Sequence, residues 1–172
     1  MRLRPYVHSH DFDLIKNWIT DERAHALWSA NRFRFPLDKD DFGGFLDNAF
    51  VQSNDCAFAA TEDDGTVVGF IICSVNLGSN EAMLKFVVVD PSKRGKGYGK
   101  EMVRLAAQYA YDIAKVGLVH LNVFTANAAA RKCYESVGFT ERNTTPDAFA
   151  YKGESWGRCN MTIMRDKLPI CR

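Results

Sequence analysis

The feature that most constrains this chain is a buried strand followed by a glycine-rich turn and a long helix, within residues 82–111. Residues 83–89 are nearly all apolar and rich in β-branched side chains, which is typical of a strand covered on both faces. Asp90 and Pro91 end this strand. Beyond the turn, apolar side chains recur at helical spacing, at Met102, Leu105, Ala106, Tyr109, Ala110 and Ile113. The order of these elements predicts an α/β fold.

The turn carries three alternate glycines among cations. Its residues are Arg94, Gly95, Lys96, Gly97, Tyr98, Gly99 and Lys100. Glycines let the backbone approach a ligand closely, and the free amides of a helix start favour a phosphate group. A solvated turn has the same composition, so both interpretations stay open at this point. Lys100 stands where a G-x-G-x-x-G motif has its third glycine, and no G-x-x-x-x-G-K-[ST] motif occurs, which disfavours a dinucleotide fold and a P-loop NTPase.

Two motifs in order along the chain carry a family resemblance. The pattern Arg94-x-x-Gly97-x-Gly99, after a strand that ends in Val89-Asp90-Pro91, resembles the acyl-CoA pyrophosphate signature of the GCN5-related N-acetyltransferase (GNAT) superfamily. Asn127 and the later run Tyr134-x-x-x-Gly138-Phe139 resemble its second conserved segment. A strand separates the two motifs, and the resemblance covers residues 58–162. The chain is identified as a member of this superfamily.

The resemblance implies an α/β sandwich with a mixed sheet of about seven strands, flanked by helices and with a splayed parallel pair at its centre. The length of 172 residues suits one domain. We expect acceptor-side helices in residues 1–56, a CoA-binding core in residues 57–139 and a C-terminal strand hairpin in residues 140–172.

Hydrophobic patterning predicts the remaining elements. Gly69 is expected to mark a bulge or close packing, Gly117 to cap the long helix, and Asn127 and Gly138 to begin and end the following helix. The hairpin arms are expected at residues 139–145 and 156–164, joined by a loop. The other predicted strands are residues 3–6, 57–60, 67–75 and 118–124, the last parallel to 83–89, and the predicted helices are residues 11–20, 21–29 and 39–49.

The resemblance implies acetyl-CoA as the acyl donor. It assigns the thioester oxygen and pantetheine arm to the backbone amides of Val87, Val88 and Val89, and the pyrophosphate to the loop from Arg94 to Lys100. It assigns a pantetheine contact to Asn127. Tyr134 would contact CoA and donate a proton to the departing sulfur, as a phenol within hydrogen-bond reach can. The alternative for Tyr134 is a packing role on an amphipathic helix.

The general base is the least defined part of the predicted site. A free amine with a pKa near 10 is mostly protonated at pH 7, so a proton acceptor is expected. Some relatives carry a glutamate early on the central strand, where this chain has Met83 and Lys85. Glu81 is the catalytic candidate, acting through water, and Glu154 is a second one; the family sometimes uses no dedicated base.

The acceptor amine is expected to bind in the N-terminal region. The resemblance makes Trp28, Arg32, Phe33, Arg34 and Phe35 candidates for this pocket, whereas packing aromatics and solvated arginines are the alternative. Interleaved Arg and Phe also occur in single-strand nucleic-acid binders. The Arg32/Arg34 pair favours an acceptor that carries an anionic group.

Composition narrows the function. The net charge of +1 gives no support for nucleic-acid or membrane binding. The absence of a signal-peptide pattern and of a long apolar run predicts a cytoplasmic protein. Five scattered cysteines without a C-x-x-C pair predict free thiols and no metal site.

The sequence therefore predicts an N-acetyltransferase that acts by direct ternary-complex transfer. The expected acceptor is a small-molecule amine or a peptide N-terminus, and a homodimer is the assembly considered. The alternative function is a non-catalytic module that binds and senses acyl-CoA.

Overall fold

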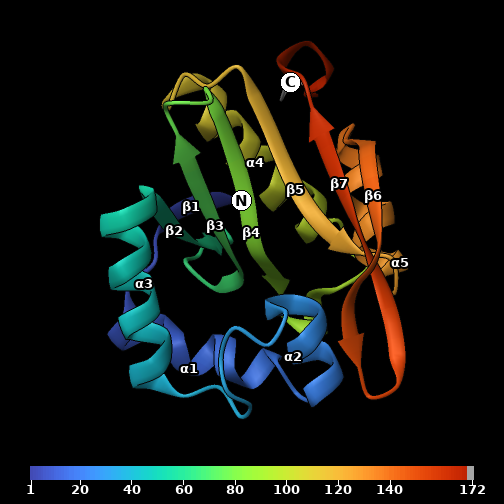
Figure 1. Cartoon of the computed structure of the whole chain (residues 1–172). Coiled ribbons are helices and arrows are strands. Elements are labelled where there is room, and N and C mark those ends of the chain that lie inside the picture. Colours follow the sequence, from blue (N-terminus) through green and yellow to red (C-terminus); the bar gives the residue numbers. More distant parts are fainter. Residues whose placement is uncertain (170–172) are drawn as a thin grey trace.

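The computed structural model describes residues 1–169 as one seven-stranded sheet with helices on both faces (Figure 1). The strand order is β1-β2-β3-β4-β5-β7-β6, and β4 and β5 are the parallel pair in an otherwise antiparallel sheet. This confirms the predicted mixed sheet. The strands are β1 (Arg2–Pro5), β2 (Asp55–Thr61), β3 (Val67–Asn76), β4 (Glu81–Val89), β5 (Leu118–Phe124), β6 (Thr140–Tyr151) and β7 (Glu154–Ile163).

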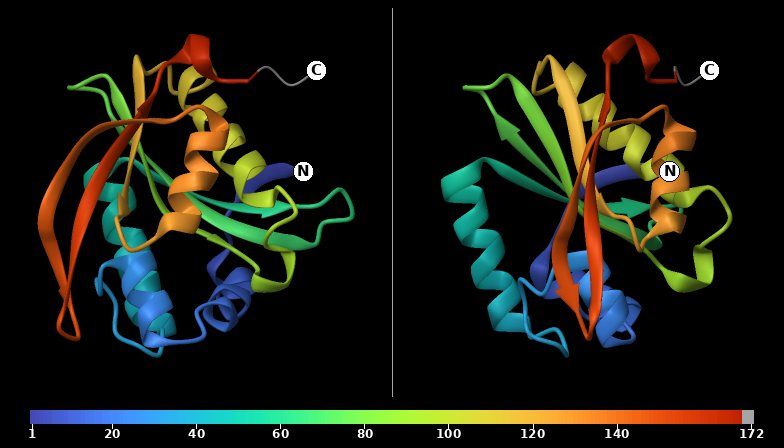
Figure 2. Two further views of the ribbon diagram at one scale, coloured as in Figure 1. Left: turned by 90° about the vertical axis from the view of Figure 1, so that its right-hand side faces the viewer. Right: turned by 45° about the vertical axis from the view of Figure 1, so that its right-hand side comes forward.

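The helices divide between the two faces of the sheet (Figure 2). The N-terminal three lie on one side and the other two on the opposite side. They are α1 (His8–Trp18), α2 (Glu22–Ser29), α3 (Lys39–Ser53), α4 (Tyr98–Asp112) and α5 (Ala128–Val137). All five predicted helices are present, with α1 beginning earlier and α3 ending later than expected. None of the helices among residues 1–169 is long and apolar enough to cross a membrane.

The sequence of β3 is a nearly continuous apolar run because both faces of this strand are buried. Ile71 and Cys73 pack in the core that α4 and α5 cover, whereas Phe70 and Ile72 pack in the core on the side of α1 and α3. All four side chains are fully buried. A strand covered on both faces needs apolar residues at every position, because successive side chains point to opposite faces.

The start of α1 depends on an ion pair. Asp11 is buried, and it accepts hydrogen bonds of 2.7 Å from both terminal nitrogens of Arg4 and one of 2.8 Å from the amide of Val7. Burial acts to raise the pKa of Asp11, but the hydrogen bonds from Arg4 and Val7 outweigh it and lower the pKa. The charged carboxylate thereby holds the chain between β1 and α1, and α1 begins at His8.

Strand β4 is bulged and then separates from β5. Its pairing with β3 shifts between Ile72↔Lys85 and Phe70↔Val88, and Phe86 within the shift has a positive φ of 51°. Pairing with β5 ends at Leu84, so the rest of β4 has no partner on that side. The predicted splayed parallel pair is confirmed.

The predictions for Gly69 and Gly117 can be compared with the packing around each glycine. A Cβ on Gly69 would lie 2.6 Å from the Met102 sulfur and 3.1 Å from the Val88 carbonyl oxygen, which confirms close packing at this position. The prediction that Gly117 caps the long helix is wrong, because α4 ends at Asp112. A Cβ on Gly117 would lie 2.8 Å from the Asn80 side-chain nitrogen, so this glycine serves a close contact with the loop before β4.

The C-terminal hairpin is longer than predicted. The expected loop between residues 145 and 156 is strand instead, and only Lys152 and Gly153 connect β6 and β7. Both have positive φ, 44° and 85°, as a two-residue hairpin turn requires. The polar run of β6 obscured the strand in the sequence, because β6 lies at the sheet edge with most of its side chains exposed.

Replacing Gly153 by alanine should destabilise the hairpin. A left-handed φ costs a residue with a Cβ about 1–2 kcal/mol, and no atom lies within 4 Å of the position that a Cβ would take, so no clash adds to this cost. We expect the melting temperature to fall by about 2–8 °C. Asparagine tolerates this conformation better, so Gly153→Asn should lose less than Gly153→Ala; equal losses would contradict the explanation.

Candidate active site

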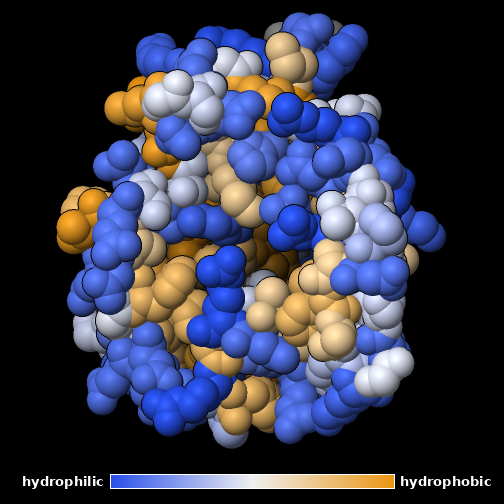
Figure 3. All heavy atoms as spheres, viewed as in Figure 1, coloured by the Kyte–Doolittle hydropathy of each residue, from blue (hydrophilic) through white to orange (hydrophobic). Residues whose placement is uncertain are grey.

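A cleft of about 1210 Å³ opens where β4 and β5 diverge. It is the hollow with an apolar floor near the centre of the face in Figure 3. Strand β4, the loop before α4 and helix α5 form one half, which we name the donor half, and α2, α3 and the start of β2 form the other, named the acceptor half. Residues of β5, β6 and β7 form the wall between the two ends of the cleft.

The start of α4 is an open cluster of backbone donors. Gly97 is the N-cap with a φ of 87°, and no side chain caps the helix. The first amide with a partner is that of Glu101, which donates to the Gly97 carbonyl. Within residues 1–169 the amides from Gly95 to Lys100 have no hydrogen-bond acceptor. Free amides and a helix dipole at one point favour an anion.

Side chains around these amides divide into two groups. Arg94 and Lys100 line the cleft. Lys96 instead donates to the Ser92 carbonyl over 3.3 Å, and Tyr98 donates its hydroxyl to Glu62, so neither side chain lines the cleft. Of Lys96 and Tyr98, only the backbone amides are left without a hydrogen-bond partner within residues 1–169.

The predicted pyrophosphate loop fits the group it is expected to hold. Gly95 and Gly97 have positive φ, and no atom lies within 4 Å of the place where either would carry a Cβ, so the space beside them is open. A Cβ on Gly99 would lie 3.3 Å from the Cys133 sulfur, so this glycine lets α5 pack against α4. The open backbone, the free amides and the two cations match the negative charge and bulk of a pyrophosphate.

The three valines predicted to hold the thioester lie at the splay. Val87, Val88 and Val89 all line the cleft, beyond the last residue of β4 that pairs with β5. The bulge at Phe86 changes the direction in which the following peptide groups point. The structure thus brings these valines and the start of α4 to one cavity.

Helix α5 completes the donor half. The side chain of Asn127 caps it by accepting from the Ala130 amide at 3.2 Å, and Gly138 ends it with a φ of 114°, as predicted. Asn127 and Tyr134 both line the cleft. The Tyr134 hydroxyl has no hydrogen-bond partner among residues 1–169, and burial raises the pKa of this phenol. Tyr134 therefore presents a protonated, unshared hydroxyl to the cleft at neutral pH.

The structure does not bring Glu81 to this cavity. Glu81 begins β4, six residues before Val87, and a strand rises about 3.3 Å per residue. It lies 4.0 Å from His120 and 3.9 Å from Arg142, and it does not line the cleft. Glu154 is also outside; its ion pair with Arg23 lowers its pKa to about 2.

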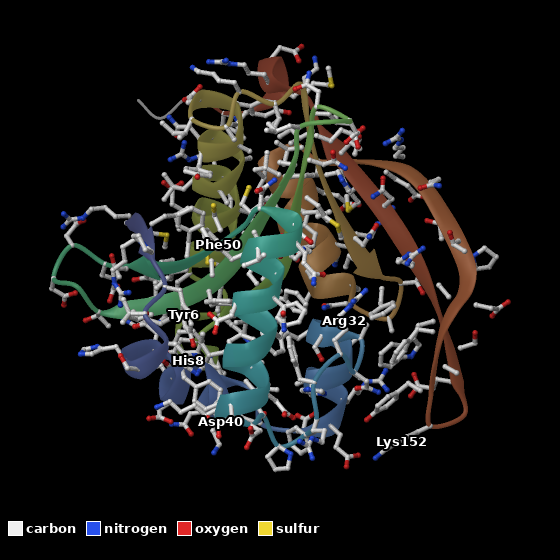
Figure 4. The ribbon with its side chains drawn as sticks, turned by 60° about the vertical axis from the view of Figure 1, so that its left-hand side comes forward. Tyr6, His8, Arg32, Asp40, Phe50 and Lys152 are labelled. Atoms are coloured by element: carbon white, nitrogen blue, oxygen red, sulfur yellow. The ribbon has the colours of Figure 1, made fainter. Side chains whose placement is uncertain are left out.

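Two of the five predicted acceptor residues line the cleft. These are Trp28 and Arg32, and Figure 4 shows Arg32 between α3 and the β6–β7 hairpin. Phe33 is buried in the core against Phe42, with ring centroids 5.1 Å apart. The other two also lie off the cleft.

Arg34 and Phe35 face outward. Arg34 is 81% exposed in its side chain and pairs with Asp41 at 2.8 Å. Phe35 is exposed, and its ring lies against His25. Only Arg32 of this run lines the cleft, and the three residues that follow it lie in the core or face outward, which the composition of the run could not reveal.

Many residues of the cleft were not predicted as site residues, and four of them form or adjoin its charged and polar wall. Asp55 of the acceptor half forms an ion pair of 2.6 Å with Lys85 of β4, and Asn122 and Arg158 lie on the wall. Asp55 and Lys85 are brought together by the pairing of β2, β3 and β4. The one local signal was the polar Asn122 and Arg158 alternating with buried residues of β5 and β7.

Known proteins share the fold and part of the sequence. The crystal structure of a spermidine N-acetyltransferase from Vibrio cholerae in complex with CoA and spermine superposes with a TM-score of 0.81, at 20% identity over 96% of either chain. The Vibrio cholerae spermidine N(1)-acetyltransferase sequence is 22% identical over 159 residues, 91% of this chain and 89% of that one. An uncharacterised N-acetyltransferase of Methanocaldococcus jannaschii is 30% identical over 89 residues, 52% of this chain and 56% of that one.

The family follows from a match that covers most of the chain. The sequence profile of the acetyltransferase (GNAT) family matches residues 14–139, which is more than half of the sequence. The matched region contains β4 with its bulge, the open start of α4 and the cap and tyrosine of α5. The chain therefore belongs to the acetyltransferase (GNAT) family.

Proposed function

We propose that this protein is an acetyl-CoA-dependent N-acetyltransferase that transfers the acetyl group directly to a primary amine. The observation that carries the proposal is the meeting of the free amides before α4, the splayed end of β4 and the unshared Tyr134 hydroxyl in one cleft. The acceptor is a small-molecule amine or a protein N-terminus. A cytoplasmic location and a homodimer stay predictions of the sequence.

The residues of the donor half have distinct tasks. The amides from Gly95 to Lys100, with Arg94 and Lys100, bind the pyrophosphate of CoA. Asn127 uses its side-chain oxygen to cap α5, which leaves its NH₂ group free to donate to the pantetheine arm. Acetyl-CoA supplies an activated thioester. The amides of the bulged β4 polarise its carbonyl oxygen by hydrogen bonding, which is commonly a large catalytic contribution.

Tyr134 delivers a proton to the CoA sulfur as the thiolate leaves. Its raised pKa keeps the phenol protonated, and the absence of a competing partner among residues 1–169 leaves the O–H free to turn toward the cleft. A phenol that holds its proton until negative charge develops beside it acts as a general acid.

Direct transfer is supported by the raised pKa of the Cys133 thiol, which disfavours a covalent acetyl-cysteine intermediate. This cysteine lines the cleft beside Tyr134, but burial raises the pKa of its thiol. A thiol that stays protonated at neutral pH is a poor nucleophile. We expect the intact protein to gain no acetyl mass when incubated with acetyl-CoA alone, as measured by mass spectrometry; a stable gain on Cys133 would replace direct transfer with a covalent intermediate.

The test of the proposal is turnover with a panel of amines. Purified protein is incubated with acetyl-CoA and each amine, and the acetylated product is measured by mass, because the five cysteines of the chain would interfere with a thiol reagent. We expect at least one amine to be acetylated, with initial rates whose double-reciprocal plots intersect. CoA binding without acetylation of any amine would favour the acyl-CoA sensing module instead.

A further inference from the structure

The acceptor half of the cleft has an excess of cations over carboxylates. Asp55 is the one carboxylate residue among the described residues that line the cleft, and its charge is matched by Lys85 at 2.6 Å. Arg32 and, on the adjoining wall, Arg158 also line the cleft, and neither guanidinium has an ion pair or hydrogen bond to another residue within 1–169. Two charged groups without counterions therefore face the cavity.

Arg158 belongs to a polar platform on the wall of the cleft. In the strand register, Asn122, Asn160 and Asn143 lie in one row across β5, β7 and β6, and Arg158 and Thr145 lie in the next. These residues share one face, because positions two apart on a strand point the same way. Together with Arg142 they line a depression of about 360 Å³ that adjoins the cleft through Asn122 and Arg158.

The asparagines of the platform orient one another. The side-chain NH₂ of Asn160 donates to the Asn122 oxygen at 2.9 Å and to the Leu121 carbonyl at 3.2 Å. With its oxygen occupied, Asn122 has its own NH₂ group left to present to the cleft. The wall thus offers hydrogen-bond donors from both Asn122 and Arg158.

A further donor lies in the acceptor half. The indole N–H of Trp28 is buried and has no acceptor within the described part of the chain. A buried donor without a partner costs free energy unless a ligand or water accepts from it. The donors without a partner in this half and on the adjoining wall are two guanidinium groups, an amide NH₂ and an indole N–H, and they outnumber the acceptors, which are the two buried oxygens of Asp55 beside Lys85.

From this geometry we infer that the acceptor amine carries an anionic group, a carboxylate or a phosphate, which Arg32 and Arg158 bind. The inference rests on the proposed function and names its substrate class. Both groups present several acceptor oxygens, which guanidinium groups match in charge and shape. A polycation such as spermidine has several ammonium groups to satisfy, whereas Asp55 is the one carboxylate among the described residues that line the cleft, and Lys85 lies 2.6 Å from it.

The experiment compares matched amines that differ in one anionic group. The pairs are ethanolamine and phosphoethanolamine, glucosamine and glucosamine 6-phosphate, and 3-aminopropanol and β-alanine, with spermidine as the polycation. We expect the anionic member to have the higher kcat/KM in at least one pair, by about 10-fold or more. The phosphate and carboxylate pairs distinguish the two sources of charge.

Variants then test whether Arg32 and Arg158 cause the preference for an anionic amine. Arg32→Ala and Arg158→Ala should each lower kcat/KM for the anionic amine about 10- to 100-fold and leave the neutral amine within about 3-fold. Arg34→Ala is the matched control, since Arg34 is two residues away, exposed and paired with Asp41 outside the cleft. It should change neither rate.

The outcomes separate this inference from the proposed function. Acetylation of neutral amines or spermidine at least as fast as of anionic ones overturns the inference and leaves the acetyltransferase intact. An anion preference that survives both arginine variants also overturns it. Failure to acetylate any amine, with CoA bound, defeats the proposed function itself.

Discussion

Replacement of Tyr134 by phenylalanine is expected to lower kcat for acetyl transfer by about 100-fold or more. The proposed role of the hydroxyl is to protonate the leaving sulfur, and general acids of this kind contribute about 100- to 10,000-fold. The hydroxyl has no hydrogen bond to residues 1–169, so its removal breaks none of the described contacts, and the ring keeps its packing against Phe139. Steady-state kinetics at saturating acetyl-CoA and acceptor measure the loss.

Stability and cofactor binding serve as the controls for this variant. The melting temperature of Tyr134→Phe should stay close to that of the parent protein, because no hydrogen bond is lost. The Kd for CoA, measured by calorimetry, should rise by less than about 5-fold, since the pyrophosphate loop is untouched. An unchanged kcat in a folded, CoA-binding variant would remove Tyr134 from the mechanism.

The pH dependence follows from the direction of the pKa shift. Burial raises the pKa of Tyr134, and a group with a raised pKa keeps its proton as the pH rises through the usual range near 10. An acid that stays protonated gives no alkaline decrease of kcat below about pH 10. We expect kcat/KM to increase with pH as the acceptor amine loses its proton, without a decrease from this tyrosine.

The central part of the fold could be predicted because local and tertiary signals agree there. The apolar run at residues 83–89 predicted a buried strand, and the glycines and apolar spacing after it predicted a turn and a helix. The observed β4 and α4 follow that pattern. The length of the hairpin arms was underestimated because the local sequence signal there does not agree with the tertiary contacts. Strand β6 is held by its pairing with β7 and by stacking of Tyr151 on Trp156, with centroids 4.8 Å apart, and neither contact is visible in a mostly exposed, polar sequence.

The donor half of the site was predictable and the acceptor half was not. The donor residues lie on one continuous strand, loop and helix, where spacing along the sequence determines spacing in the molecule. The acceptor half and the wall together join α2, α3, β2 and β7, so Asp55 and Arg158 reach one cleft through sheet pairing alone. Arg32 and Arg34 are similar in sequence, but the loop turns one toward the cleft and the other toward Asp41.

Replacement of Gly97 by alanine is expected to weaken CoA binding by about 10- to 100-fold. Gly97 has a φ of 87°, which a residue with a Cβ adopts only at a cost, and relaxation of this strain would redirect the free amides that follow it. The new methyl group would also project into the open space beside the loop, where the pyrophosphate is proposed to bind. Each charge-assisted hydrogen bond lost there is worth about 1.5–3 kcal/mol, which is the basis of the expected change in Kd.

Gly65 provides the control that isolates the ligand from the strain. It lies in the turn between β2 and β3 with a φ of 91°, and a Cβ added to it would likewise have no atom within 4 Å. Gly65→Ala should therefore lose a similar amount of stability, about 1–2 kcal/mol, while its Kd for CoA stays unchanged, because Gly65 does not line the cleft. If both variants bind CoA equally well, the loop before α4 holds no pyrophosphate, and the donor site has to be sought elsewhere in the cleft.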